Sequence, residues 1–244
     1  MILALETATT ACSAALCAAD GSVVAERVSL DGPAHSQRLL PFVHEILTEA
    51  GAGWTDLDTI AVGLGPGAFT GLRIGIATAR ALAQADGRLR LAGVPTLAAL
   101  ALALAAGSPP TARFVPLVDG RRREVFAAVY EPAASGVIAL VDDAVAVPAA
   151  ELAGWLAARG DVVVGGDGAV LYADLLPVSA RPAAGVVAPA AAMVGRAVAC
   201  GAPGVVWGPD AVLPIYGRAP DAAPWSGGGM RAPGAESPAP GGSS

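Results

Sequence analysis

A glycine-rich stretch at residues 64–75, LGPGAFTGLRIG, carries the residue types best suited to holding a ligand. Gly65, Pro66 and Gly67 predict a tight turn from a strand into a helix, and Thr70 can cap that helix. The N–H groups at the start of the helix could then hold an anion. An ordinary connection between a strand and a helix explains the same residues, so both interpretations stay open.

A charged turn at residues 118–125, VDGRRREV, is the second candidate. Asp119 could hold a metal-bound water, and an arginine of the turn could meet a phosphate or a carboxylate. Charged turns are also common as solvated surface, and this alternative stays open. The matching turn of the first half, residues 6–10, lacks the glycine that lets backbone approach a phosphate closely. We therefore expect a degraded or absent phosphate site.

A glycine cluster at residues 165–168, GGDG, follows an expected strand and could pass close to an adenine or a ribose. A lone cluster of this kind is weak evidence for a nucleotide. We predict at most a weak nucleotide site, for which the candidate residues are Thr9, Thr10, Asp119, Gly166 and Gly168.

Several residue types that common catalytic sites need are missing. All 15 basic residues are arginines, so a Walker-type phosphate loop and lysine Schiff-base chemistry are excluded. The only histidines, His35 and His44, are nine residues apart and do not form a two-histidine metal motif. Cys12, Cys17 and Cys200 make no C-x-x-C pair, and no serine or cysteine lies in a nucleophile elbow. We expect no catalytic residue, no metal site and no cofactor.

The charge and the apolar pattern limit the partners. A net charge of −6 opposes unaided binding to the phosphate backbone of a nucleic acid. Pro95, Gly107, Pro109 and Pro110 interrupt the uncharged run at residues 91–112, which favours a buried helix over a membrane span. Glu6 lies where the apolar core of a signal peptide would be. A cytoplasmic protein without membrane contact is expected.

The hydrophobic pattern predicts an alternation of strands and helices that starts twice along the chain. The first series has strands at 2–5, 12–18 and 23–29, a helix at 36–50, a strand at 57–63, a helix at 70–85, a strand at 89–94 and a helix at 96–106. The second series has strands at 113–119, 124–131 and 137–141, a helix at 148–159, a strand at 162–165 and a helix at 189–200. Both series follow one βββα-type plan.

This plan indicates an α/β protein of the actin-like (ASKHA, ribonuclease-H-like) class, in which two βββα-type lobes face each other across a cleft. Sugar kinases and Hsp70-type ATPases share the plan. The proline-rich segment at 107–112 is the best internal boundary. We expect an N-terminal lobe at 1–106, a C-terminal lobe at 107–216, and a disordered tail rich in Gly, Pro, Ala and Ser at 217–244.

The motifs resemble, in order along the chain, those of a known bacterial family. The dimerisation subunit of the tRNA threonylcarbamoyladenosine machinery, the TsaB or YeaZ type, has similar segments. The run at 65–75 is shared with that family's catalytic paralogue, the TsaD type, while the turn at 119–125 and the short second half favour the dimerisation subunit. Glu6 departs from the family's aspartate, and Gly120 from its alanine. The matching segments are 2–9 (ILALETAT), 35–41 (HSQRLLP), 65–75 (GPGAFTGLRIG), 119–125 (DGRRREV) and 213–218 (LPIYGR).

The resemblance implies a non-catalytic scaffold subunit of the complex that transfers a threonylcarbamoyl group to the adenosine next to the anticodon of tRNAs. The implied partners are the TsaD-type paralogue and a P-loop ATPase of the TsaE type. The subunit would contact tRNA only indirectly, through the complex. When it is alone, it could form a homodimer. The alternative function is that of an ATP-dependent phosphotransferase or acyltransferase of the same fold. A peptidase is a weaker alternative, because this sequence has neither a recognisable nucleophile nor a zinc motif. The residues implied in complex function are His35, Gly65, Pro66, Gly67, Phe69, Thr70, Arg73, Asp119, Arg121, Arg122 and Glu124.

The helices expected at 36–50 and 70–85 are predicted to form the partner surface. Gly71 and Gly75 are four residues apart, so they share with Ala79 a helix face that another helix can approach closely. Some positions must instead face the sheet, because lobes of this class cover their sheets with helices. The interface candidates are Leu39, Val43, Gly71, Gly75, Ala79 and Leu82.

Overall fold

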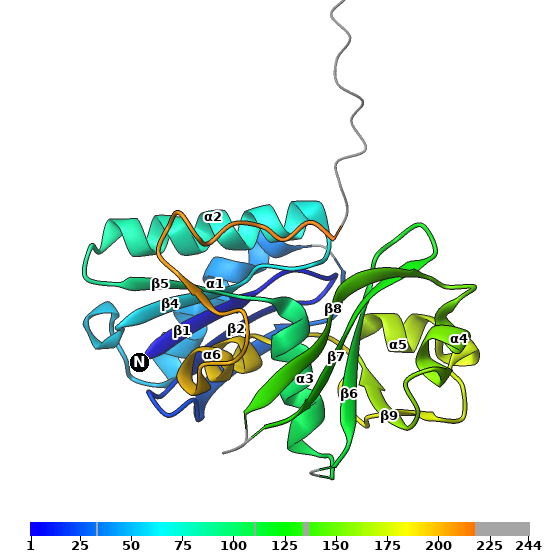
Figure 1. The fold of residues 1–244 in the computed structure, drawn as a ribbon. Helices are drawn as coiled ribbons and strands as arrows, with labels where there is room; N and C mark the ends of the chain where they lie inside the picture. Colours follow the sequence, from blue (N-terminus) through cyan, green and yellow to red (C-terminus); the bar gives the residue numbers. More distant parts are fainter. Residues whose placement is uncertain (33, 110, 134–136, 218–244) are drawn as a thin grey trace, which may run out of the picture.

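The computed structural model describes residues 1–32, 34–109, 111–133 and 137–217. Two sheets lie beside each other (Figure 1); five strands of the first half and one short strand near the end of the chain form the first, and the second half forms the other. The first has the order β11-β5-β4-β1-β2-β3, and the second has the order β10-β9-β6-β7-β8. The expected tail lies outside the described residues, apart from Gly217.

The first sheet begins with an antiparallel meander, because the Asp20-Gly21 turn folds one short strand back on the next. Strands β4 and β5 then add in parallel on the other side of β1. The strands are β1 (Ile2–Glu6), β2 (Cys12–Cys17), β3 (Val23–Ser29), β4 (Thr59–Gly63), β5 (Arg90–Val94) and β11 (Val206–Trp207).

The second sheet repeats this arrangement, with a meander followed by two parallel strands on the other side of its first strand. Across each sheet, the first five strands of that half therefore lie in the same order: the third strand along the chain, then the second, the first, the fourth and the fifth. The two-lobed α/β fold of actin-like plan is confirmed. The strands are β6 (Arg113–Asp119), β7 (Glu124–Pro132), β8 (Ile138–Pro148), β9 (Val162–Gly165) and β10 (Ala180–Pro182).

The helices form three layers around the two sheets. Helices α1 (His35–Glu49) and α2 (Phe69–Ala85) cover the outer face of the first sheet, and α4 (Leu152–Ala157) and α5 (Asp167–Leu171) pack on the second. Helices α3 (Thr96–Ala106) and α6 (Ala191–Cys200) lie between the sheets, in a core that both lobes share. Short 3₁₀ helices lie at Trp54–Asp56 and Ala173–Leu175.

Helix α3 explains the long apolar run of the sequence. Because it is enclosed between two sheets, it is apolar on every side instead of amphipathic. Within the described residues, no helix combines the length and the apolar character that a membrane crossing requires.

Two expected elements differ from the observed ones, and two observed strands were not expected. Strand β8 continues past the expected end at 141 to Pro148 and includes Asp142 and Asp143, because it is the exposed edge of its sheet and tolerates charge. Helix α4 is correspondingly shorter than the helix expected at 148–159. Strands β10 and β11, of three and two residues, are too short to give a periodic signal.

The lobes are not continuous stretches of chain. Helix α6 packs on β1 and β2, and β11 pairs with β5, so the chain returns to the first lobe after residue 190. The expected range of 107–216 for the second lobe is wrong at this end, because a two-residue strand gave no sign of the return. We propose residue 107 as the boundary where the chain leaves the first lobe.

Candidate functional site

The glycine-rich loop after β4 is fixed to the start of α3. The N–H of Gly65 donates to Thr96 Oγ1 (3.1 Å), and the N–H of Thr96 donates to the Gly65 carbonyl (2.8 Å). Gly65 has a φ of +97°, and a Cβ atom there would lie 2.7 Å from the Ile215 carbonyl oxygen. Only glycine fits this conformation and this space. The Gly65–Pro66 peptide bond is cis.

The other glycines of the motif let α2 pack against the first loop, the turn that follows β1. Cβ atoms would collide with the carbonyl oxygen of Ala8 from Gly67, with that of Thr7 from Gly71, and with the Thr7 hydroxyl from Gly75. Thr7 Oγ1 donates to the Gly71 carbonyl (2.9 Å), so the contact is polar as well as close. These contacts support the interpretation of the motif as a packing element.

Glu6 is buried beneath these loops. Its Oε1 accepts from the N–H of Ala8 (2.7 Å), and its Oε2 accepts from Thr96 Oγ1 (3.0 Å). Burial raises the pKa of this carboxyl group, while its hydrogen bonds oppose the rise and the charge of Asp167 adds to it. Glu6 therefore joins β1, the first loop and α3 into one network.

We expect Glu6→Gln to melt at a higher temperature than the wild type at neutral pH, because it removes a buried charge. A pKa raised on folding means that the folded state binds the proton more tightly, so the wild type loses stability as the pH rises through that pKa. The advantage of the variant should shrink as the pH falls towards 4.5, the usual pKa of a glutamate. Thermal melts of both proteins between pH 4.5 and neutral pH measure the difference in melting temperature. A difference that grows as the pH falls would contradict this prediction.

The second loop, between β6 and β7, lies across the cleft from the first. The N–H of Asp119 donates to Asp167 Oδ1 (3.0 Å), and the N–H of Arg121 donates to Asp119 Oδ1 (2.9 Å). The guanidinium group of Arg121 pairs with Asp119 Oδ2 (3.2 Å). The N–H of Gly120 donates to the carbonyl of Glu124 (2.9 Å). The N–H groups of Asp119, Gly120 and Arg121 are therefore all bonded within the protein.

Two N–H groups of the first loop are also bonded within the protein. The N–H groups of Ala8 and Ala11 donate to the Glu6 carboxylate and to Thr9 Oγ1 (3.2 Å). A phosphate in the cleft would have to displace these bonds and approach two aspartates as well. The contacts weigh against a phosphate site at this place.

A cavity of about 350 Å³ lies between the two loops, with Thr10, Asp119, Arg121 and Asp167 in its wall. Burial and the charge of Asp119 raise the pKa of Asp167, against the lowering effect of its hydrogen bonds and of Arg121. Leu30, Val170, Leu171 and Val187 form an apolar rim.

The structure brings together only some of the residues predicted for a weak nucleotide site. Thr10 and Asp119 lie in the cavity, whereas Thr9 is buried and bonds the backbone of Ala11. Gly166 and Gly168 pack against the backbone of Leu117 and serve the contact between α5 and β6. Asp167 was not among the candidates, although an acidic residue at the carboxyl end of a strand could have indicated it.

His35 is buried at the start of α1, against Gly71. Burial lowers the pKa of its imidazole, and a hydrogen bond to the backbone of Thr9 opposes the shift. Its Nδ1 has no hydrogen-bond partner among the described residues. His35 thus packs between the first loop and α2, and His44 is exposed elsewhere on α1. The described residues hold no group of three or more His, Cys, Asp or Glu side chains able to bind a metal ion together.

The turn at 121–123 is conformationally unusual. Arg121, Arg122 and Arg123 all have left-handed φ values, of 61°, 50° and 63°. Each such residue costs about 1 to 2 kcal/mol relative to a right-handed conformation.

We expect Arg123→Gly to stabilise the protein by about 1 kcal/mol, because glycine adopts this conformation without strain. The melting temperature should rise by about 2 to 4 °C for a chain of this size. Arg88→Gly, at an exposed arginine without a positive φ, is the control and should lower it. A lower melting temperature for Arg123→Gly would show that its side chain contributes more than the strain costs.

Residues far apart in sequence form an exposed cluster at the start of α2. The guanidinium group of Arg73 lies 3.9 Å from the ring centroid of Phe69, and the rings of Phe69 and Tyr216 stack at 5.2 Å. Arg73 Nε donates to the hydroxyl of Tyr216 (3.3 Å). The final described segment, drawn in orange in Figure 1, runs along α2 to reach this place. The N–H of Ile215 holds it by donating to the Leu64 carbonyl (2.7 Å).

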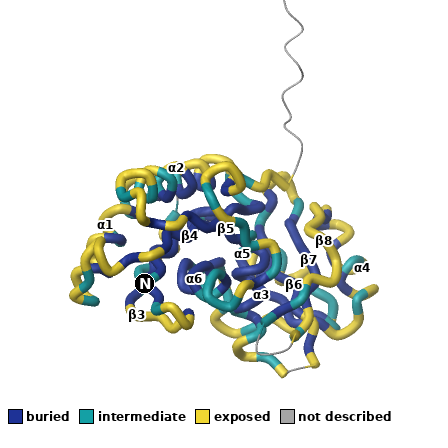
Figure 2. Tube along the Cα trace, turned by 60° about the vertical axis from the view of Figure 1, so that its left-hand side comes forward, coloured by how far each residue is buried: buried dark blue, intermediate teal, exposed yellow. Residues whose placement is uncertain are grey.

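The residues predicted to contact a partner subunit face the interior of their own chain instead. Its residues pack against the first sheet and the first loop of their own chain, because small side chains allow that close approach. Exposed residues instead follow the outer side of α2 (Figure 2). The misplaced residues are Leu39, Val43, Gly71, Gly75 and Ala79, which are buried, and Leu82, which is half-buried on the same core.

The two sheets of equal strand order, joined by a shared helical layer, define a two-lobed protein of the actin-like class. The family model described as "TsaD: tRNA N6-adenosine threonylcarbamoyltransferase" matches residues 15–163, more than half of the chain. A crystal structure from Pseudomonas aeruginosa, described as similar to the peptidase YEAZ, is 34% identical and covers 89% of this chain and 99% of its own, with a TM-score of 0.72. A second structure, YeaZ from the same organism, is also 34% identical, with a TM-score of 0.70, and covers 88% of this chain and 98% of its own.

The chain therefore belongs to the TsaD and YeaZ family, as the motifs predicted. The tRNA threonylcarbamoyladenosine biosynthesis protein TsaB of Escherichia coli is 43% identical over 136 residues, which are 56% of this chain and 57% of that protein. The protein of the same name from Bacillus subtilis is 34% identical over 130 residues, 53% of this chain and 55% of its own. The chain spans about half the length of these curated relatives.

Proposed function

We propose that this protein is a non-catalytic subunit of the machinery that makes threonylcarbamoyladenosine in tRNA. The names of its relatives in Escherichia coli, Haemophilus influenzae and Bacillus subtilis support the pathway. The observation that carries the non-catalytic role concerns five N–H groups in the two loops of the cleft, those of Ala8, Ala11, Asp119, Gly120 and Arg121. All five donate to the protein's own side chains and carbonyls. An actin-like enzyme would need those groups for nucleotide phosphates.

The charges in the cleft support the same proposal. Asp119 and Asp167 line the cavity, and Glu6 is close enough to Asp167 for their charges to interact. A phosphate placed among them would be repelled, and Arg121, the arginine in the cavity wall, is already paired with Asp119. The rival function of a phosphotransferase or acyltransferase has no comparable support.

The proposed partner is the catalytic TsaD-type paralogue, and its docking surface is the outer side of α1 and α2. Leu40 and Phe69 are each 52% exposed there, and Ala77 and Ala81 form an exposed row of small side chains one helical turn apart. Aromatic and arginine side chains such as Phe69 and Arg73 are typical anchors of protein interfaces. The charged turn at 119–125 would then meet the TsaE-type ATPase or the catalytic lobe, and tRNA would be reached only through the assembled complex.

Size-exclusion chromatography with light scattering tests the proposal when the protein is mixed with its TsaD-type paralogue. We expect a complex with one copy of each chain, and no hydrolysis of labelled ATP by this chain alone. Failure to form the complex, or hydrolysis that survives repurification and is lost in Asp119→Asn, would refute the scaffold function.

A further inference from the structure

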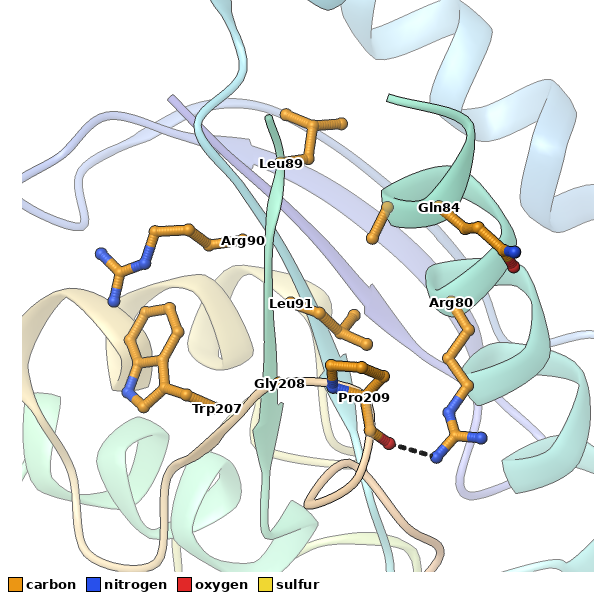
Figure 3. A pocket seen from close by; sticks show the side chains of 9 residues that line it. Arg80, Gln84, Leu89, Arg90, Leu91, Trp207, Gly208 and Pro209 are labelled. Carbon is orange, nitrogen blue, oxygen red and sulfur yellow. Dashed lines mark hydrogen bonds between the residues drawn. The ribbon is translucent and has the colours of Figure 1, made fainter. Parts of the chain in front are cut away.

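A pocket of about 670 Å³ lies at the edge of the first sheet, where β11 ends after two residues (Figure 3). It is separate from the cleft, with which it shares no lining residue among those described. Its volume is in the range of sites for drug-sized ligands. Its wall is formed by Arg80, Ala83 and Gln84 of α2, Leu89, Arg90 and Leu91 at β5, and the segment Trp207, Gly208 and Pro209.

The pocket exists because the chain leaves the sheet early. Gly208, with a φ of +89°, turns the chain away from β5 after Trp207 and carries it across to α2. Arg80 fixes this crossing, since its Nη2 donates to the carbonyls of Pro209 (2.5 Å) and Val212 (2.8 Å). The place beside the start of β5 that a longer strand would fill is left open.

The pocket is positively charged in a negatively charged protein. Arg80 and Arg90 line it, and its described lining residues include no carboxylate, whereas the whole chain has a net charge of −6. An anion in the pocket would be attracted by these two guanidinium groups, because no carboxylate of the described lining residues neutralises them.

The pocket also offers flat and apolar surfaces. The guanidinium group of Arg90 stacks on the indole of Trp207 at 3.9 Å, and 41% of Trp207 remains exposed. Figure 3 shows Arg80 and Gln84 on one side of β5 and the Arg90–Trp207 pair on the other. Leu91 and Pro209 lie between them, so a ligand can contact a charged group and an apolar wall together.

We propose that this pocket binds a phosphate ester that carries a flat ring, the chemistry of a nucleoside monophosphate. The phosphate is held by Arg80 and the Gln84 amide, and the ring packs on Leu91, Pro209 and the Arg90–Trp207 pair. A free nucleotide and the end of a single-stranded RNA share this chemistry. The proposal does not rest on the proposed function, because no residue named for the docking surface lines this pocket.

Titration calorimetry of the full chain with AMP tests the proposal, with quenching of tryptophan fluorescence as a local signal. We expect saturable AMP binding at one site, weaker at high salt, and a quench that is lost in Trp207→Phe although the other three tryptophans remain. Adenosine and inorganic phosphate, used separately, should each bind at least about tenfold more weakly than AMP, because each lacks half of the contacts. Tighter binding of a single-stranded tetranucleotide than of AMP would identify an RNA end as the natural source.

Arg90→Gln should weaken AMP binding by about tenfold, because it removes the cationic group on which the ring packs together with Trp207. Arg88→Gln is the matched control: it removes the same charge two residues away, from a side chain that pairs with Asp86 and does not line the pocket. Equal melting temperatures would show that both variants fold. Absence of AMP binding, AMP binding that Arg90→Gln leaves unchanged, or equal binding of phosphate and AMP would overturn the proposal.

Discussion

Gly75→Ala is expected to destabilise the folded protein by about 3 kcal/mol, although alanine is the better helix former. The new methyl group would collide with the buried hydroxyl of Thr7, and moving that hydroxyl would break its hydrogen bond to the Gly71 carbonyl. Overpacking of a core costs about 1 to 3 kcal/mol, and the lost hydrogen bond adds about 1 kcal/mol. The melting temperature should fall by on the order of 10 °C.

Gly154→Ala is the control for this effect. Gly154 is also inside a helix, but a Cβ atom there would have no neighbour within 4 Å. The change should therefore stabilise the protein by about 0.5 to 1 kcal/mol through helix propensity alone. Thermal melts of both variants decide the point. If Gly75→Ala melts like the wild type but no longer pairs with the TsaD-type paralogue, Gly75 lies at the subunit interface and the packing described here is incorrect.

Ala77→Glu is expected to weaken pairing with the TsaD-type paralogue by a hundredfold or more, about 3 kcal/mol, while the subunit folds normally. Ala77 is exposed on the outer side of α2, one turn from both Arg73 and Ala81. At a close contact between α2 and a helix of the paralogue, the new carboxylate would lose its water, and no positive charge of the paralogue is positioned to compensate for that loss. Titration of the labelled subunit with its paralogue measures the change in affinity.

Ala153→Glu is the matched control for the pairing experiment, because Ala153 is exposed on helix α4 of the other lobe. It should leave both the melting temperature and the affinity unchanged. Equal affinities for the two variants would place the partner surface away from the outer side of α2.

The fold was largely predictable, because strand alternation, the Asp20-Gly21 turn and helical periodicity are local signals. The double start of the element order predicted two similar lobes, and the observed strand orders agree. The return of the chain to the first lobe was not predictable. It depends on α6 packing against β1 and β2 and on a strand of two residues, neither of which has a local signal.

The candidate site was predicted less well, because which side of a helix faces its sheet is a tertiary property. The face of Gly71, Gly75 and Ala79 fits close packing against a partner or against its own chain, and the sequence cannot distinguish them. The stacking of Phe69 with Tyr216 joins positions separated by most of the chain. The bonding of the cleft N–H groups likewise depends on Asp167, which approaches the second loop only in the fold.

Single-turnover transfer of a labelled threonylcarbamoyl group to tRNA tests the central claim most directly. With the TsaD-type paralogue held constant and the full set of partners present, we expect transfer to rise with added subunit and to level off at one subunit per paralogue. This chain alone should give no transfer at any concentration. Transfer by the chain alone, proportional to its concentration and abolished in Asp119→Asn, would contradict the account, because contamination by the paralogue could not depend on that residue.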